Sequence, residues 1–387
     1  MSPLPTDLYD RSSKLFAKLK GYYTHGAELP PLISQRTAFA CAVLYTVLFV
    51  APYYLSPKLR STPANSRDAP SVIRARTRAA GLTCLASTVI TVYLLAIHGH
   101  ATPHDVSRLL GLWPVQAIDI ANVMGLVMVL FVGPLYASLI VESGWRQVTF
   151  RGAKDTLFDS WTGYRNFVVA PASEEIVFRS LVIPLFILAK MPPKQIIFLT
   201  PLIFGLAHVH HMADFCRTHT PVGRTLPTLG VFLQALLRAV FQFCYTSLFG
   251  FFTAFAFLRT GNLYAIILAH SFCNFMGFPR LWGRLESADN DYIHVAPDVT
   301  QGKRDEGVGH AQRDESPDGG VKVGNILMQP EDESSERARQ ATTAVSTRLG
   351  LGWTVVYYVL ILAGAYGFYR LLFPLTESPN ALVVFSR

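Results

Sequence analysis

The sequence predicts an all-α, polytopic membrane protein in which about eight transmembrane helices surround an intramembrane cavity open to the cytosol. Three observations predict this fold: the composition, a series of long uncharged windows, and polar side chains inside those windows. Of the 387 residues, 51% are hydrophobic and only 16% are charged, whereas an ordinary soluble domain carries about 25% charged residues. The apolar content excludes a chain that is disordered as a whole.

Eight windows are long enough to be membrane spans, since a helix needs about 20 mostly apolar residues to cross the hydrocarbon layer. Seven windows contain no Asp, Glu, Lys or Arg, namely 37–57, 79–104, 120–141, 195–213, 239–258, 260–279 and 349–369. The remaining window, 166–189, is the fourth along the chain and is apolar except for Glu174, Glu175 and Arg179. Only helices and closed barrels satisfy the backbone in lipid, and windows of this length predict helices.

The Lys and Arg residues between the windows predict the orientation. The loops 58–78, 142–165 and 214–238 carry 13 of them, and the alternate loops carry 4. Cytosolic loops are enriched in Lys and Arg, so the richer set is predicted to face the cytosol. The basic N-terminal tail, which this orientation places on the opposite side, is the exception. The net charge of +8 is spread in short clusters between apolar runs, so no nucleic-acid partner is expected.

The chain is interpreted as a single membrane domain, 1–387, with one polar insertion. Residues 284–348 are rich in Asp, Glu, Gly, Ser and Arg, and such a segment is predicted to be a disordered loop because it buries little apolar surface. The first 36 residues contain no apolar stretch typical of a cleavable signal peptide. The five cysteines show no CxxC spacing, which disfavours a disulfide framework or a zinc knuckle.

Three charged residues in window 166–189 mark a candidate site, because each costs about 2.5–3.5 kcal/mol on membrane insertion. Glu175 and Arg179 are four residues apart and are predicted to form an ion pair on one helix face. Glu174 is rotated by about 100° from Glu175 on an α-helix, so it points to a different face and is free to line a polar cavity. The alternative is a purely structural ion pair.

Two other windows carry polar residues at a similar depth. His208 lies near the end of the fifth window, and His270 and Asn274 in the seventh are four residues apart and share one helix face. With the predicted orientation and a rise of 1.5 Å per residue, these side chains and Glu174 lie about 8–15 Å below the cytosolic surface. Three helices thus place polar groups at one level, which predicts a shared site.

These residue types are typical of hydrolysis. A carboxylate and a neighbouring imidazole can accept a proton from water, and His and Asn on one face can donate hydrogen bonds to a developing oxyanion. The motif HExxH is absent, so a catalytic metal is the less favoured alternative and no metal or cofactor is predicted. A transporter or channel that uses the buried Glu, Arg and His as a proton or ion relay remains an alternative, as does a catalytically inactive scaffold.

Three motifs carry a resemblance to a known family. Glu174 to Arg179 reads EExxxR, Phe204 to His208 reads FxxxH, and His270 to Asn274 reads HxxxN. Their order on successive windows resembles the CAAX protease and bacteriocin-processing family, in particular its type II CAAX endopeptidases. The resemblance covers residues 165–280, the expected catalytic core. It implies an intramembrane endopeptidase, without a metal, that removes the last three residues from prenylated CaaX proteins.

The resemblance also implies a role for each site residue. Glu174 would be the general base and His208 its partner in proton transfer, while His270 and Asn274 would form the oxyanion site. Glu175 and Arg179 would support these four. Prenylated Ras-like GTPases and similar proteins would be the substrates, the bilayer would be the surrounding medium, and the active site of the multi-pass enzyme would face the cytosol from the endoplasmic reticulum membrane.

Overall fold

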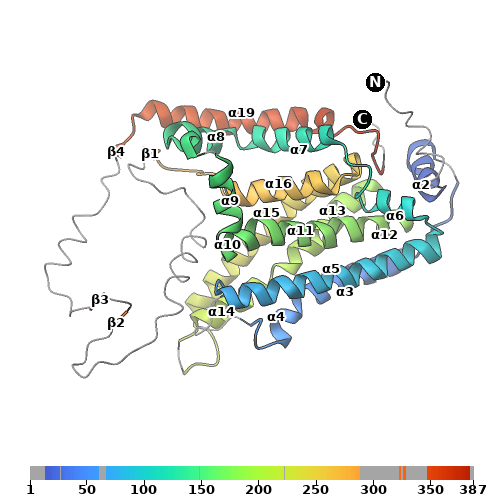
Figure 1. Cartoon of the computed structure of the whole chain (residues 1–387), viewed down its shortest axis with the longest axis horizontal. Coiled ribbons are helices and arrows are strands. Elements are labelled where there is room, and N and C mark those ends of the chain that lie inside the picture. Colours follow the sequence, from blue (N-terminus) through green and yellow to red (C-terminus); the bar gives the residue numbers. More distant parts are fainter. Residues whose placement is uncertain are drawn as a thin grey trace.

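The structure is a computed structural model that describes residues 14–26, 28–60, 67–147, 149–221, 223–287, 322–323, 326–327 and 347–383. Figure 1 shows a bundle of long helices that run side by side, with α3 and α5 along one side and α7 and α19 along the other. The prediction of an all-α, polytopic membrane protein is confirmed, because long apolar helices make up the bundle.

The first part of the chain forms α2 (Lys14–His25), α3 (Gln35–Val50), α4 (Pro52–Leu55), α5 (Pro70–Gly99), α6 (Pro103–Leu109), α7 (Ala117–Leu130), α8 (Val132–Leu135), the π-helix η1 (Tyr136–Val141), the 3₁₀ helix η2 (Gly144–Gln147), α9 (Phe150–Phe158) and α10 (Trp161–Tyr164). The second part forms the π-helix η3 (Arg165–Val169), α11 (Ala170–Glu175), the π-helix η4 (Ile176–Leu181), α12 (Val182–Leu188), α13 (Pro193–Ala207), α14 (His210–His219), α15 (Leu229–Thr260), α16 (Leu263–Met276) and α19 (Leu351–Leu375). Two short antiparallel pairs join β1 (Glu286–Ser287) to β4 (Thr347–Arg348) and β2 (Lys322–Val323) to β3 (Ile326–Leu327).

All eight predicted windows are helical, but they differ in length and continuity. Among the described residues, five helical segments are long and apolar enough to cross a membrane. The third window would be a sixth span, although it bends by 78° between α7 and the segment Val132–Val141. Window 260–279 contains α16, which has only 14 residues, and the fourth window consists of short helical segments. The count of eight spans therefore stays a prediction.

The fourth helix runs without interruption from Trp161 to Leu188 and begins five residues before the predicted window. Its first turn is capped by Ser160, whose hydroxyl oxygen accepts a hydrogen bond from the Gly163 N–H at 2.9 Å. The helix passes through η3 before α11 and through η4 after it. π-turns inside helices are frequent at functional sites, and here they flank the segment that carries both glutamates.

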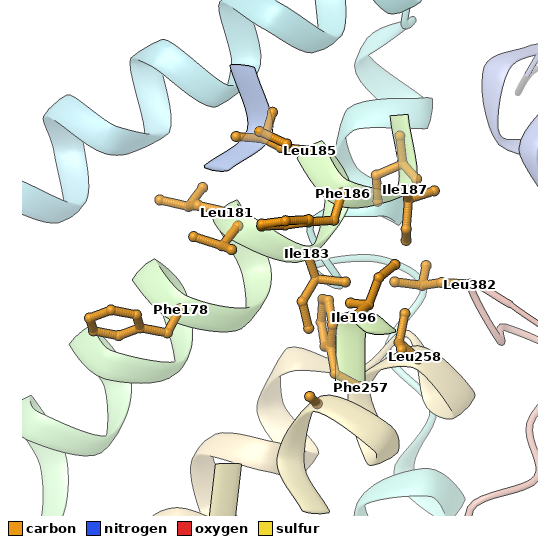
Figure 2. Packing of buried hydrophobic residues seen from close by; sticks show 14 of the residues in the cluster. Phe178, Leu181, Ile183, Leu185, Phe186, Ile187, Ile196, Phe257, Leu258 and Leu382 are labelled. Atoms are coloured by element: carbon orange, nitrogen blue, oxygen red, sulfur yellow. The ribbon is translucent and has the colours of Figure 1, made fainter. Parts of the chain in front are cut away.

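The core of the bundle surrounds the end of this helix. All seven residues of α12 are buried, as expected of a helix that is apolar on every face. Figure 2 shows Ile183 and Phe186 of α12 close to side chains from α13 and α15 and from the C-terminal segment, including Ile196, Phe257 and Leu382. The Leu382 N–H donates a 2.8 Å hydrogen bond to the Leu258 carbonyl, which fixes the C-terminal segment against α15.

Helices α2 and α6 lie at one end of the bundle (Figure 1). The N-terminal region was predicted only as a polar tail, but α2 buries three apolar residues. It docks on α6, where the Phe16 N–H donates to Asp105 Oδ1 at 2.9 Å and the Arg108 guanidinium lies 4.0 Å from the Phe16 ring centre. The predicted disorder of 284–348 concerns residues that lie almost entirely outside the described ranges.

Candidate active site

A cavity of about 850 Å³ lies between the fourth helix and helices α13 to α16, with further lining residues from α3 and α5. Four of the residues singled out in the sequence, Glu174, His208, His270 and Asn274, line this cavity together. The tertiary structure thus brings together three segments that are up to 100 residues apart in the chain. Glu175 and Arg179 do not line the cavity and lie behind it, almost completely buried.

Glu174 lies between two imidazole rings. Its Oε2 is 3.9 Å from Nε2 of His208 and 3.8 Å from Nε2 of His270. These distances exceed those of direct hydrogen bonds and suit a bridging water. The side chains of Glu174 and His208 are each 15% exposed, so both present polar atoms to the cavity. One carboxylate oxygen and two ring nitrogens therefore converge on the same space.

His208 is held in one tautomer by the backbone. Its Nδ1 lies 2.9 Å from the Phe204 carbonyl oxygen, and because a carbonyl can only accept, Nδ1 carries the hydrogen. In the neutral ring, Nε2 is then a free acceptor directed toward Glu174. The Phe204 ring packs edge-on against the imidazole, with the ring centres 4.6 Å apart. The FxxxH spacing thus supplies both the acceptor and the ring that orient His208.

His270 is anchored from behind by a buried ion pair. Its Nδ1 lies 2.7 Å from Glu175 Oε1, which is also 3.2 Å from Arg179 Nη1. The pair predicted from the i, i+4 spacing is therefore present. The contact from His270 to Glu175 was not predicted, because spacing along one helix says nothing about a side chain from another. His270 thus has a different glutamate at each ring nitrogen.

Helix α15 approaches this ion pair closely at Gly250. A Cβ atom at that position would lie 2.9 Å from Arg179 Nη2 and 2.5 Å from Cβ of Pro201. Only a residue without a side chain lets α15 approach both groups. The Arg179 guanidinium also lies 4.2 Å from the Phe204 ring centre, a cation–π contact that further compensates the buried charge.

Asn274 is oriented by the backbone of η3. Its Nδ2 donates a 3.0 Å hydrogen bond to the Asn166 carbonyl, and Ser271 Oγ donates to the Phe167 carbonyl at 2.5 Å. Both bonds join α16 to η3. A carboxamide nitrogen carries two hydrogens, so the second N–H of Asn274 can donate a hydrogen bond to another acceptor in the cavity. Ser271, which carries none of the three motifs, thus also positions α16 on η3.

The sequence reading missed several residues at the cavity. Asn166 supplies the carbonyl that orients Asn274, and the Phe249 ring centre lies 4.6 Å from that of His270. Arg165 lines the cavity as well, although it was assigned to a cytosolic loop because the apolar window begins after it. Arg165 and Asn166 lie at the start of the apolar window in the sequence, which was the available signal. Only the structure shows that the helix begins earlier, at Trp161, and carries both residues to the cavity.

One group of described residues has ligand atoms spaced for a metal ion: His210, His211 and Asp214, all within 4.8 Å of one another. The Asp214 carboxylate is already near two guanidinium groups, with Arg76 at 3.8 Å and Arg217 at 3.9 Å. Positive charges so close oppose the binding of a cation. The expectation of a reaction without a metal stays a prediction.

Comparisons with known proteins agree on one family. The family model described as type II CAAX prenyl endopeptidase Rce1-like matches residues 155–276, a range that contains all six candidate residues. The probable CAAX prenyl protease 2 of Schizosaccharomyces pombe is 30% identical over 256 residues, which cover 66% of this chain and 86% of the relative.

Two further relatives lead to the same assignment. The CAAX prenyl protease 2 of Arabidopsis thaliana is 30% identical over 271 residues, which cover 65% of this chain and 82% of the relative. That of Homo sapiens is 36% identical over 185 residues, which cover 46% and 52%. No solved structure gives a significant match. The identity over most of the length of two relatives, together with the family match across the cavity, shows that the chain belongs to the type II CAAX prenyl endopeptidase family.

Proposed function

We propose that this multi-pass membrane protein is a CaaX prenyl endopeptidase that removes the C-terminal aaX tripeptide from prenylated proteins such as Ras-like GTPases. The observation that carries the proposal is the position of Glu174 Oε2, less than 4 Å from Nε2 of both His208 and His270 in one cavity. Membership of the family supports the substrate class. The same membership does not favour the alternative of a transporter or channel.

The first step is the activation of water between Glu174 and His208. A water at this point donates one hydrogen to Glu174 Oε2 and the other to the free Nε2 of His208, so both hydrogens are fixed by acceptors. As the water oxygen attacks the carbonyl carbon after the prenylated cysteine, Glu174 takes a proton as general base. His208 keeps its ring in place through the Phe204 carbonyl and shares the proton.

The negative charge that develops on the carbonyl oxygen is stabilised by His270 and Asn274. Glu175 accepts the hydrogen of His270 Nδ1 and fixes the ring, so that Nε2 faces the cavity and, when the ring carries both hydrogens, donates to the oxyanion. The second N–H of Asn274 is the other donor. Donors that are already oriented for the oxyanion lower the barrier more than flexible ones, and both are held by hydrogen bonds behind them.

The intermediate breaks down when the amide bond to the tripeptide is cleaved. The proton held by Glu174 passes to the leaving nitrogen, and the second hydrogen of the water passes through His208 to the same nitrogen, so the aaX tripeptide departs with an ammonium group at its amino terminus. One water has been consumed and the new carboxylate remains on the prenylated cysteine. Glu174 returns to its ionised form, so the catalytic groups are regenerated without a cofactor.

A membrane cavity suits this substrate. A prenyl chain gains about 0.8 kcal/mol for each methylene buried in lipid, and the CaaX cysteine lies at the cytosolic surface because prenylation occurs at the C-terminus of cytosolic proteins. We place the protein in the endoplasmic reticulum membrane with the cavity accessible from the cytosol, in keeping with the excess of Lys and Arg in the loops on that side.

The test uses purified full-length protein in detergent and a farnesylated peptide ending in a CaaX sequence. Mass spectrometry measures the release of the tripeptide, with Glu174→Gln as the inactive control. Wild-type protein is expected to release tripeptide and Glu174→Gln to release none above background. A transporter or an inactive scaffold would release none in either case, and addition of a strong chelator separates this reaction from a metal-dependent one.

A further inference from the structure

The cavity has a basic wall in addition to the Glu174 cluster. Among the described residues that line it, three are arginines, Arg67, Arg76 and Arg165, while Glu174 is the one acidic residue. Asp68 lies within 4 Å of both Arg67 and Arg165, and Asp214 lies 3.8 Å from Arg76, so three arginines face two aspartates and an excess of positive charge remains on this wall. A cavity wall with an excess of positive charge attracts an anion.

Arg165 is held rigidly and has one guanidinium nitrogen left over. Its Nε donates to Asn166 Oδ1 at 2.9 Å and its Nη1 donates to Asp68 Oδ1 at 2.7 Å. Its Nη2 is buried and makes no hydrogen bond to any described residue. A buried donor without a partner costs free energy, which an anion bound beside it would recover. The Nη2 group carries two hydrogens and part of the positive charge, so it can donate a charge-assisted hydrogen bond to a carboxylate oxygen.

The position of Arg165 along the helix fits the length of a tripeptide. Arg165 and Glu174 lie on one continuous helix, nine residues apart, which corresponds to at most about 13.5 Å along its axis, because the π-helical residues of η3 rise less than the 1.5 Å per residue of an α-helix. Three extended residues span about 10 Å, and the distance across a salt bridge from the carboxylate to the guanidinium makes up the remainder of the separation between Glu174 and Arg165. A peptide whose scissile carbonyl lies at Glu174 therefore places its terminal carboxylate near Arg165.

We propose that Arg165, in the positive potential of Arg67 and Arg76, binds the α-carboxylate at the C-terminus of the substrate. This inference rests on the proposed function and deepens it: the distance from the arginine to Glu174 selects the bond three residues from the chain end. Asn166 links the two places, since its side chain holds Arg165 and its carbonyl orients Asn274. Arg165 is thus a substrate-binding residue that sets the register of cleavage.

The test compares two farnesylated CaaX peptides of the same sequence, one with a free C-terminal carboxylate and one with a C-terminal amide. Wild-type protein is expected to cleave the amide with a kcat/KM lower by about 10- to 100-fold, the value of a charged hydrogen bond. Arg165→Gln is expected to lose a similar factor on the acid and little on the amide. Arg217→Gln is the matched control, because Arg217 lies close to an aspartate, Asp214, as Arg165 does to Asp68, but does not line the cavity, and it should keep the wild-type ratio.

Each outcome decides between the proposals. Equal cleavage of both peptides by wild-type protein overturns the carboxylate site and leaves the endopeptidase intact, and this comparison needs no variant. An equal loss on both peptides in a folded Arg165→Gln protein assigns Arg165 a structural role and likewise overturns the proposal. A wild-type protein that cleaves neither peptide overturns the endopeptidase, and the carboxylate site with it.

Discussion

The fourth helix has two halves with opposite surroundings. The cavity half, Arg165–Glu175, presents charged side chains to the cavity and offers backbone carbonyls to α16. The core half, Ile176–Leu188, is buried without a break from Val177 onward and packs on α13 and α15 (Figure 2). A rigid, apolar half thus anchors the half that carries the chemistry, and catalytic groups need such support to keep their geometry.

The two glutamates stand at the boundary between these halves. Glu174 is partly exposed in the cavity, whereas Glu175 is fully buried against Arg179 and His270. Adjacent residues of the same type therefore have different tasks: one faces the substrate and the other holds the site together. The two tasks are separated by variants, because a change at Glu174 is expected to lower activity alone and a change at Glu175 to lower both activity and stability.

The largest effect is expected for Glu174→Gln. Loss of the general base lowers turnover of a prenylated CaaX peptide by about 10²- to 10⁴-fold, and the thermal unfolding midpoint in detergent stays close to that of the wild type because the Glu174 carboxylate lies beyond direct hydrogen-bond distance of both imidazoles. Tripeptide release and thermal unfolding are measured on the same preparation. Turnover comparable to wild type would refute the role assigned to Glu174.

Glu175→Gln is expected to lower stability as well as activity. It leaves the Arg179 charge buried without an anionic partner, which costs about 3–5 kcal/mol, and it replaces the charged acceptor of His270 with a neutral amide oxygen. Unfolding in detergent measures the first effect. The double variant Glu175→Gln/Arg179→Met should recover most of the stability without recovering activity, and a double variant as unstable as the single one would contradict this account.

Asn274→Ala is expected to lower kcat by about 10²- to 10³-fold with little change in KM, since the removed donor acts mainly in the transition state. Steady-state kinetics on the free-acid peptide separate the two constants. Ser271→Ala, which removes the neighbouring contact between α16 and η3 but no donor to the oxyanion, is the matched control. If KM rose while kcat held, Asn274 would be a substrate-binding residue instead.

The smallest effect is expected in the core half. Ile183→Val removes one buried methylene and destabilises the protein by about 0.5–1.5 kcal/mol, while turnover per folded molecule stays at the wild-type value. Thermal unfolding and active-site titration on one sample give both quantities. A clear fall in turnover would mean that the core half does more than anchor the cavity half.

Much of the fold was predictable from local sequence pattern, because in a lipid bilayer a long uncharged window satisfies its backbone hydrogen-bonding groups by forming a helix. The ion pair of Glu175 and Arg179 was also predictable, since both residues lie on one helix at a spacing of four. The docking of α2 by Phe16 and Asp105 was not, because a short amphipathic helix is a weak signal until its partner surface is known. The Arg165 position was missed for a similar reason: the helix starts at a polar cap, before the apolar window.

The sequence by itself determined that the chain is helical, lies in a membrane, and carries two glutamates, two histidines, an arginine and an asparagine in spans where such residues are costly. Only the tertiary structure decided which of them meet. His270 contacts Glu175 across 95 positions of sequence, and Glu174 faces both imidazoles because the packing of α13 and α16 on the fourth helix brings them there. Periodicity fixes the face of one helix, whereas the rotation and depth of its neighbours depend on side chains that pack together from every part of the chain.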